Sequence, residues 1–357
     1  MAHGSRDGLN FDLLKRICET PGVAGREDAV RALVRDELAG LVDEVSVDAL
    51  GNVVGVRKGQ GGPRVIVMAH MDEIGFLVKH IDDKGFIRIH PVGGFDPRVL
   101  PAQRVIVHGF GGEQLRGALQ IGAKPIHLLD PGEIKPPKIE DLFVDLGLSG
   151  DDVKARVEVG DMITLDRTVE RVGHTVMGKS LDDRICVFQM IEALRRLSGP
   201  TSAEIVAVAT TQEEVGLRGA TTAAYHVDAQ IAVALDITLA QDIPGGAEQD
   251  QITRLNGGAA IKIMDSSTIS NYKLVRHLRE IADANGIPYQ LEILPRGGTD
   301  AGAGQRARGG VPAVTISIPT RYVHTVNEMA TVSDVDASIN LLARYLEHAH
   351  EGEYGFA

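Results

Sequence analysis

Carboxylate and imidazole side chains follow the ends of several apolar segments in this 357-residue sequence. The apolar run 64–69 leads into His70 and Asp72, and the apolar run 231–235 ends at Asp236. In an open α/β sheet, ligands bind beyond the carboxyl ends of the strands. Further candidates stand after predicted strands or open a predicted helix, namely Glu213, Glu214, His324, Asp182 and Asp183. These ligand types suit Zn²⁺ and similar divalent ions, so the pattern favours a metal site.

Each candidate taken alone has an ordinary structural explanation. A single His after a strand is most often a hydrogen-bonded residue, Asp182 could cap a helix, and Glu213 with Glu214 could form a solvated turn. Asp236 is harder to explain in this way, because it ends a strongly apolar run and a buried carboxylate needs a partner. The combination therefore carries more weight than any single member.

Alternating strands and helices are predicted to position these side chains. The strands are predicted at 64–69, 204–210, 230–236, 259–264, 289–294 and 311–318, and the helices at 181–197, 270–284 and 333–348. This alternation predicts an α/β domain with a largely parallel sheet.

The pattern changes between residues 74 and 171, where short apolar segments recur between Gly, Asp and Pro residues. No helix-length amphipathic pattern occurs there, and residues 82–85 are typical of a hairpin turn. We therefore expect a small β-rich domain at 74–171, inserted into a discontinuous α/β domain formed by 1–73 and 172–357.

Composition excludes several classes of partner. With 37 basic and 49 acidic side chains the net charge is −12, which argues against nucleic acid because phosphates would be repelled. Aromatic residues make up only 4%, and there is no Trp, which argues against a sugar-binding function because sugar sites usually use aromatic faces.

No run of 18 apolar residues occurs, and residues 1–10 are polar, so we expect neither a membrane span nor a signal peptide. Cys18 and Cys186 lie in apolar stretches without metal-site spacing, which favours a cytoplasmic protein.

Two other enzyme classes remain as alternatives. Residues 173–180 match the G-x-x-x-x-G-K-[ST] pattern of a P-loop NTPase, although Asp182 and Asp183 follow directly and would compete with phosphate for the helix N-terminus. A glycosidase could use Glu213 and Glu214, but neighbouring residues in an extended segment point in different directions. Glycosidase carboxyl groups must instead face each other across about 5–9 Å. A G-x-G-x-x-A match at 302–307 is weak, because it does not directly follow a strand.

Six motifs in order resemble those of the tetrahedral (TET-type) aminopeptidases, a family of co-catalytic dinuclear metallopeptidases with relatives labelled glutamyl aminopeptidase or cellulase. They are residues 69–73, 179–184, 212–216, 234–238, 297–301 and 322–325. The resemblance implies removal of N-terminal residues from short peptides. It also implies that 74–171 is a barrel- or PDZ-like dimerisation domain, and that dimers assemble into a tetrahedral dodecamer.

The resemblance also implies a role for each motif residue. His70, Asp182 and Asp236 would hold one divalent ion, and Asp182, Glu214 and His324 a second, with Zn²⁺ or Co²⁺ expected and Asp182 bridging. Two such ions can share a water and lower its pKa, and Glu213 would act as the general base toward this nucleophile. Asp72 would orient His70. A substrate-binding loop would include Gly298, Thr299 and Asp300.

Overall fold

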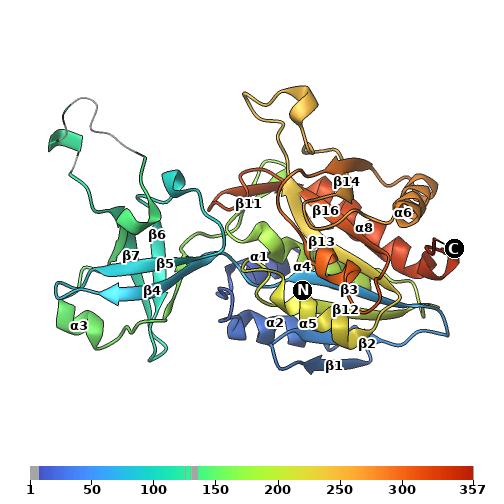
Figure 1. Ribbon diagram of the computed structural model, residues 1–357, viewed down its shortest axis with the longest axis horizontal. Coiled ribbons are helices and arrows are strands. Elements are labelled where there is room, and N and C mark those ends of the chain that lie inside the picture. The colour runs from blue at the N-terminus through green and yellow to red at the C-terminus, as the bar shows by residue number, and fades with distance from the viewer. Residues whose placement is uncertain (1–7, 125, 129, 131–135, 357) are drawn as a thin grey trace.

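The computed structural model describes residues 8–124, 126–128, 130 and 136–356 (Figure 1). Residues 1–7, which form most of the polar N-terminal stretch, lie outside this range. The chain forms an eight-stranded sheet covered by helices and, to one side of it, a closed six-stranded barrel. The prediction of an α/β domain with an inserted β-rich domain is therefore confirmed. Within the described residues, no helix is both long and apolar enough to cross a membrane.

The large sheet is parallel at its centre and mixed at its flanks. Its order is β1 (Glu44–Val47), β2 (Val53–Arg57), β12 (Glu204–Thr210), β3 (Arg64–His70), β13 (Ile231–Leu239), β16 (Ala313–Thr320), β14 (Ala259–Met264) and β15 (Tyr289–Ile293). The four strands from β12 to β16 are parallel, whereas β1, β2 and β14 run antiparallel to inward neighbours. The four central strands therefore end at one edge.

Helices cover both faces of the sheet, and β3 shows how its side chains alternate between them. Val65 and Val67 join a large cluster with the helices α1 (Phe11–Glu19), α2 (Asp28–Leu38), α4 (Leu181–Arg195), α6 (Tyr272–Asn285) and α8 (Val332–His348). Ile66 and Met68 face a smaller cluster with α5 (Arg218–Val227) and α7 (Asp300–Gln305). Because both faces are covered, the central strands read as continuous apolar runs in the sequence.

The second face is packed with small residues, which explains the G-x-G-x-x-A match. A Cβ atom at Gly304 would lie 2.8 Å from the Cβ of Ala232 and 3.0 Å from the Cε of Met68. Glycine here allows α7 to pack closely on β13 and β3. The motif is therefore a packing feature of this helix.

The barrel has its own hydrophobic core. It consists of β4 (Gly75–Ile81), β5 (Ile87–Val92), β8 (Leu142–Asp145), β7 (Gln114–Ile121), β6 (Arg104–His108) and β9 (Met162–Leu165), with α3 (Gly150–Lys154) beside it. Phe76, Val105 and Ile163 are fully buried inside it. The predicted hairpin turn between β4 and β5 is present, because the Asp82 carboxylate accepts hydrogen bonds from the backbone of Lys84 and Phe86.

The segment 173–180 is not a phosphate-binding loop. Its first two residues form the turn of a hairpin between β10 (Glu170–Val172) and β11 (Thr175–Gly178), and its middle is β11 itself, which also pairs with β17 (Glu328–Thr331). The Lys179 ammonium is buried and donates to the Glu73 carboxylate, which also accepts from the Ser180 hydroxyl at 2.8 Å. The P-loop alternative is therefore wrong, because both polar side chains of the motif are already paired inside the protein.

A buried ion pair between Lys262 on β14 and Glu292 on β15 yields a stability prediction, since both side chains are almost fully buried. Lys262→Met should lower the free energy of unfolding by about 3–5 kcal/mol, because Glu292 is left as an uncompensated buried charge. The double variant Lys262→Met/Glu292→Leu should recover most of this loss. Urea-induced unfolding followed by circular dichroism measures both. Lys154→Met is the control. It breaks an exposed ion pair with Asp83 and should change the free energy of unfolding by less than about 1 kcal/mol. A double variant as unstable as the single one would contradict the explanation.

Candidate functional site

The predicted metal ligands come from five separate segments that meet at one edge of the sheet. His70 ends β3, Asp182 lies in the first turn of α4, and Asp236 lies within β13. Glu214 follows β12, and His324 lies between β16 and β17. These five residues and Glu213 line a single cavity of about 450 Å³. Asp236 is three residues before the end of its strand, further inside the sheet than the sequence predicts.

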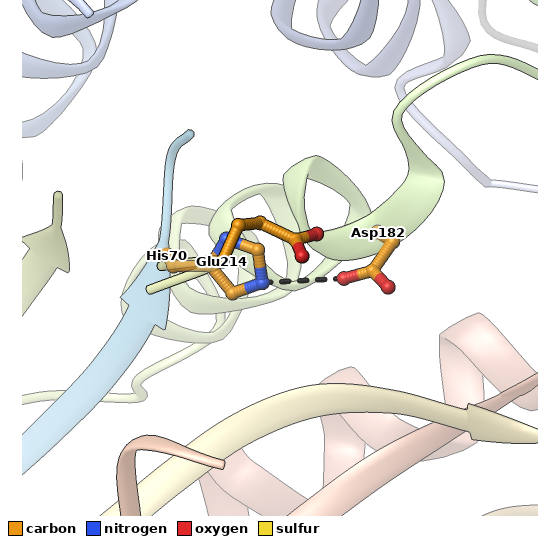
Figure 2. A group of neighbouring side chains, drawn as sticks. All are labelled: His70, Asp182 and Glu214. Atoms are coloured by element: carbon orange, nitrogen blue, oxygen red, sulfur yellow. Dashed lines mark hydrogen bonds and ion pairs between the residues drawn. The ribbon is translucent and has the colours of Figure 1, made fainter. Parts of the chain in front are cut away.

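Two groups of side chains have ligand atoms close enough to share an ion. In one, the ligand atoms of His70, Asp182 and Glu214 all lie within 4.8 Å of one another (Figure 2). In the other, His70 is joined by Asp183 and Asp236, and all three are buried. Imidazole nitrogen and carboxylate oxygen are good ligands for Zn²⁺ and for related divalent ions. The described donor set therefore fits the metal-binding chemistry that the sequence predicts.

Asp182 occupies the middle of this arrangement. Its Oδ1 lies 3.2 Å from Nε2 of His70, and its Oδ2 lies 3.2 Å from Nε2 of His324. Nε2 of His324 is also 3.4 Å from Oε1 of Glu214. One carboxylate thus presents one oxygen to each imidazole.

The electrostatics of the cavity are dominated by buried carboxylates. Burial raises the pKa of Asp236 and of Glu213 well above the usual range, and neighbouring acids add to each rise. Burial alone would lower the pKa of His324, but Asp182 and Glu214 raise it to about 12. Burial likewise opposes the rise at His70, where the negative charge of Glu213 contributes most to a pKa well above normal. The cavity therefore favours bound positive charge.

Asp72 contacts the imidazole of His70 and also holds the backbone of Glu213 and Glu214. Its side chain is fully buried, and its two carboxylate oxygens accept from the backbone N–H groups of Glu213 at 3.0 Å and Glu214 at 3.1 Å. Nδ1 of His70 lies 3.1 Å from the Asp72 carbonyl oxygen and 3.4 Å from its carboxylate. When His70 carries its proton on Nδ1, Nε2 is left to face Asp182. Of these contacts, only the one with His70 is expected from the sequence.

Two further buried acids, Asp183 and Glu328, bind the backbone of predicted ligands, which is not expected from the sequence. Oδ2 of Asp183 accepts from the His70 backbone at 3.2 Å, whereas its buried Oδ1 has no hydrogen-bond partner among the residues described. Glu328 accepts from the backbone N–H of Asp182 at 3.1 Å and of His324 at 2.8 Å. Its position four residues after His324 is the only signal of this role in the sequence.

The predicted substrate-binding loop is only partly at the cavity. Gly298 and Thr299 line it, next to an apolar wall that includes Leu217, Leu294 and Val323. Asp300 does not line it. Its carboxylate is buried at the start of α7 and accepts a hydrogen bond of 2.5 Å from the hydroxyl of Thr210.

A family model and several full-length relatives identify the family of this chain. The family model described as M42 glutamyl aminopeptidase matches residues 51–341. The sequence is 38% identical to a lysyl aminopeptidase of Pyrococcus furiosus over 346 residues, covering 95% of this chain and 97% of that protein. The structure resembles an aminopeptidase from the archaeon Desulfurococcus kamchatkensis, with a TM-score of 0.91, 39% identity and 94% of each chain covered. It also resembles the TET1 peptidase of Pyrococcus horikoshii, described as assembling into a tetrahedron or a large octahedral shell, with a TM-score of 0.83, 32% identity and coverage of 94% and 98%.

The buried carboxyl of Asp300 gives a pH prediction for the metal-free protein. Burial raises its pKa to about 6, above the 3.8 expected in the unfolded chain, so its ionisation makes the folded state less stable as the pH rises from about 4 to above 6. Asp300→Asn keeps an acceptor for Thr210 but cannot ionise. Its free energy of unfolding relative to the wild type should therefore increase by about 1–3 kcal/mol between pH 4 and pH 8.

Urea-induced unfolding at the two pH values, in the presence of a chelator, measures this difference. Asp36→Asn is the control, because the Asp36 carboxylate is largely exposed on α2. A difference between Asp300→Asn and wild type that does not vary with pH would contradict the prediction.

Proposed function

The chain belongs to the M42 glutamyl aminopeptidase family and is an aminopeptidase, and we propose that it removes N-terminal residues from short peptides using two divalent metal ions per subunit. The observation that carries this proposal is the position of the Asp182 carboxylate. Its Oδ1 lies 3.2 Å from Nε2 of His70 and its Oδ2 lies 3.2 Å from Nε2 of His324, which supports a role in bridging two ions. A bridging carboxylate also supplies negative charge between two dications that would otherwise repel each other.

The ligands divide between the two ions on either side of Asp182. His70 and Asp236 would complete one set, and Glu214 and His324 the other. Asp183 is grouped with His70 and Asp236, which makes it a further contributor on that side. When bound, Zn²⁺ or Co²⁺ would polarise the scissile carbonyl and lower the pKa of a nearby water.

Glu213 is the proposed general base. It lies in the cavity with an oxygen 3.8 Å from Nε2 of His70, and its backbone is held by Asp72. Burial raises its pKa, which brings it closer to the value that suits a group that both takes up and releases a proton near neutral pH. In the reaction, Glu213 would accept a proton from the attacking water and pass it to the leaving amine.

The cavity would bind the substrate, and the barrel would mediate assembly. The acidic cavity would hold the free α-ammonium group of a peptide, and Gly298 and Thr299 would contact the substrate beside the apolar wall. The barrel would form the dimer contact, and dimers would assemble into a tetrahedral dodecamer. Of two similar TET1 structures, one is described as a dodecamer and the other as able to form a tetrahedron or a large octahedral shell. A glycosidase is not favoured, because the family model is that of M42 glutamyl aminopeptidase and the curated relatives with 34–39% identity are named as aminopeptidases.

Removal of the ions tests the metal requirement. Dialysis against a chelator should abolish hydrolysis of aminoacyl p-nitroanilides, because the nucleophile would then keep the pKa of bulk water. Adding Zn²⁺ or Co²⁺ should restore it, with two ions per subunit found by elemental analysis. Full activity in protein shown to be ion-free would refute the proposal.

Glu213→Gln tests the general base. The variant should lose about 10²–10⁴-fold in kcat, because the amide cannot accept the proton, while it keeps both ions. Glu214→Gln is the matched control on the adjacent residue, and it should instead lower the affinity for one ion. Turnover assays together with metal titrations separate the two effects. Near-normal kcat in Glu213→Gln would show that another group is the base.

A further inference from the structure

The two imidazoles of the site are oriented by different parts of the molecule. His70 is held by Asp72, two residues away in the same domain. His324 instead has its Nδ1 2.7 Å from the carbonyl oxygen of Gly94, which follows β5 of the barrel. We propose that the inserted barrel is a working part of the metal centre, in which the Gly94 carbonyl positions His324 for its ion. This inference rests on the proposed two-ion function.

The chemistry of this hydrogen bond determines the state of the ring. A carbonyl oxygen can only accept, so Nδ1 of His324 must carry a hydrogen and donate it. Nε2 is then the nitrogen that faces Asp182 and Glu214, at 3.2 and 3.4 Å. A histidine that binds a metal through one nitrogen commonly donates from the other to a carbonyl or carboxylate, which fixes its tautomer and orientation. For His324, that second partner belongs to the barrel.

Both sides of the hydrogen bond are anchored in the barrel core. Phe95, next to Gly94, stacks on Phe76 with ring centroids 4.5 Å apart and an interplanar angle of 14°. Val326, two residues after His324, is 5% exposed and belongs to the same hydrophobic cluster as Phe76. The loop that carries His324 is thus packed into the barrel, although it comes from the sheet domain.

The sheet domain fixes the backbone of His324, and the barrel fixes its ring. The backbone of His324 is in the left-handed conformation, with φ of +60°, and its N–H donates to the carboxylate of Glu328 on β17. The ring then reaches Gly94, where a Cβ atom would lie 3.4 Å from Nδ1. At Gly93, with φ of +89°, a Cβ would lie 3.2 Å from Oε2 of Glu214. Two glycines therefore allow the barrel loop to approach Glu214 and His324, two of the proposed ligands of the same ion.

In this arrangement only one of the two ion positions depends on the barrel for its affinity. A displaced barrel would take the acceptor away from His324 but would leave the contacts between His70 and Asp72 intact. The ion held by Glu214 and His324 should then bind more weakly, while the ion held by His70 and Asp236 should be unaffected. A general loss of stability would not select one position in this way.

The test compares two phenylalanines of the barrel. Phe95→Ala removes the stacking that anchors the Gly94 loop. Phe86→Ala is the matched control, because Phe86 is also partly exposed and pairs with another barrel ring, that of Phe143 at 5.1 Å. Isothermal titration of metal-free protein with Zn²⁺ measures both affinities, and thermal unfolding of the same samples measures stability. We expect Phe95→Ala to bind one of two ions about 10–100-fold more weakly, and Phe86→Ala to bind both normally.

A second variant acts on the carbonyl itself. Replacing Phe95 by phenyllactic acid keeps the ring and converts the Gly94 carbonyl into an ester, a weaker acceptor, so one ion should again bind more weakly. Phe95→Tyr, which keeps the stacked ring, should restore the affinity lost in Phe95→Ala.

The inference is overturned if Phe95→Ala and the ester bind both ions as tightly as Phe86→Ala, or if both ions weaken equally. A wild-type chain that binds fewer than two ions would instead refute the proposed function, and the inference with it.

Discussion

The need to hold several like charges together in a buried cavity shapes the whole site. Asp182, Glu213, Glu214 and Asp236 line it, and Asp183 is grouped with Asp236, whereas the basic side chains that line it are His70, His324 and Arg296. Their mutual repulsion and their loss of water make this arrangement costly unless hydrogen bonds and cations compensate. Asp72 and Glu328 do part of this work, because each carboxylate accepts two backbone N–H groups from residues of the site. These bonds fix the backbone, so the ligand side chains stay in place despite their repulsion.

Much of this site was readable from the sequence, because its main residues follow from the topology of a parallel sheet. His70, Glu214 and His324 stand after strands whose apolar runs are easy to recognise, and the structure brings them into one cavity. The edge strand β1 and its neighbour β2 are not among the strands that the sequence predicts. β1 has a mostly exposed burial pattern in a short segment and therefore lacks the continuous apolar run of a central strand.

Other features depended on partners that are distant in sequence. Lys179 matches a phosphate-binding motif, and only the fold shows that Glu73, more than 100 residues earlier, is its partner. Glu328 has no signal beyond its position four residues after His324, and Gly94 has none, because a carbonyl that accepts from an imidazole follows no recognisable spacing in the sequence. Local pattern thus identifies the groups that would bind the ions, and tertiary contacts decide what orients them.

The pairing of β4 with β9 inside the barrel has a consequence for how the chain folds. Phe76 lies opposite Ile163, so the first and last strands of the barrel are neighbours and the chain leaves the barrel close to where it entered. The barrel has its own core, so once it has formed, it joins β3 to the later strands like a short loop. Because the entropy of loop closure grows with the length of flexible chain, a folded insert spares the sheet most of that cost. The pairing of β3 with β12 and β13, which places His70 in the cavity, is thereby favoured after the barrel has folded.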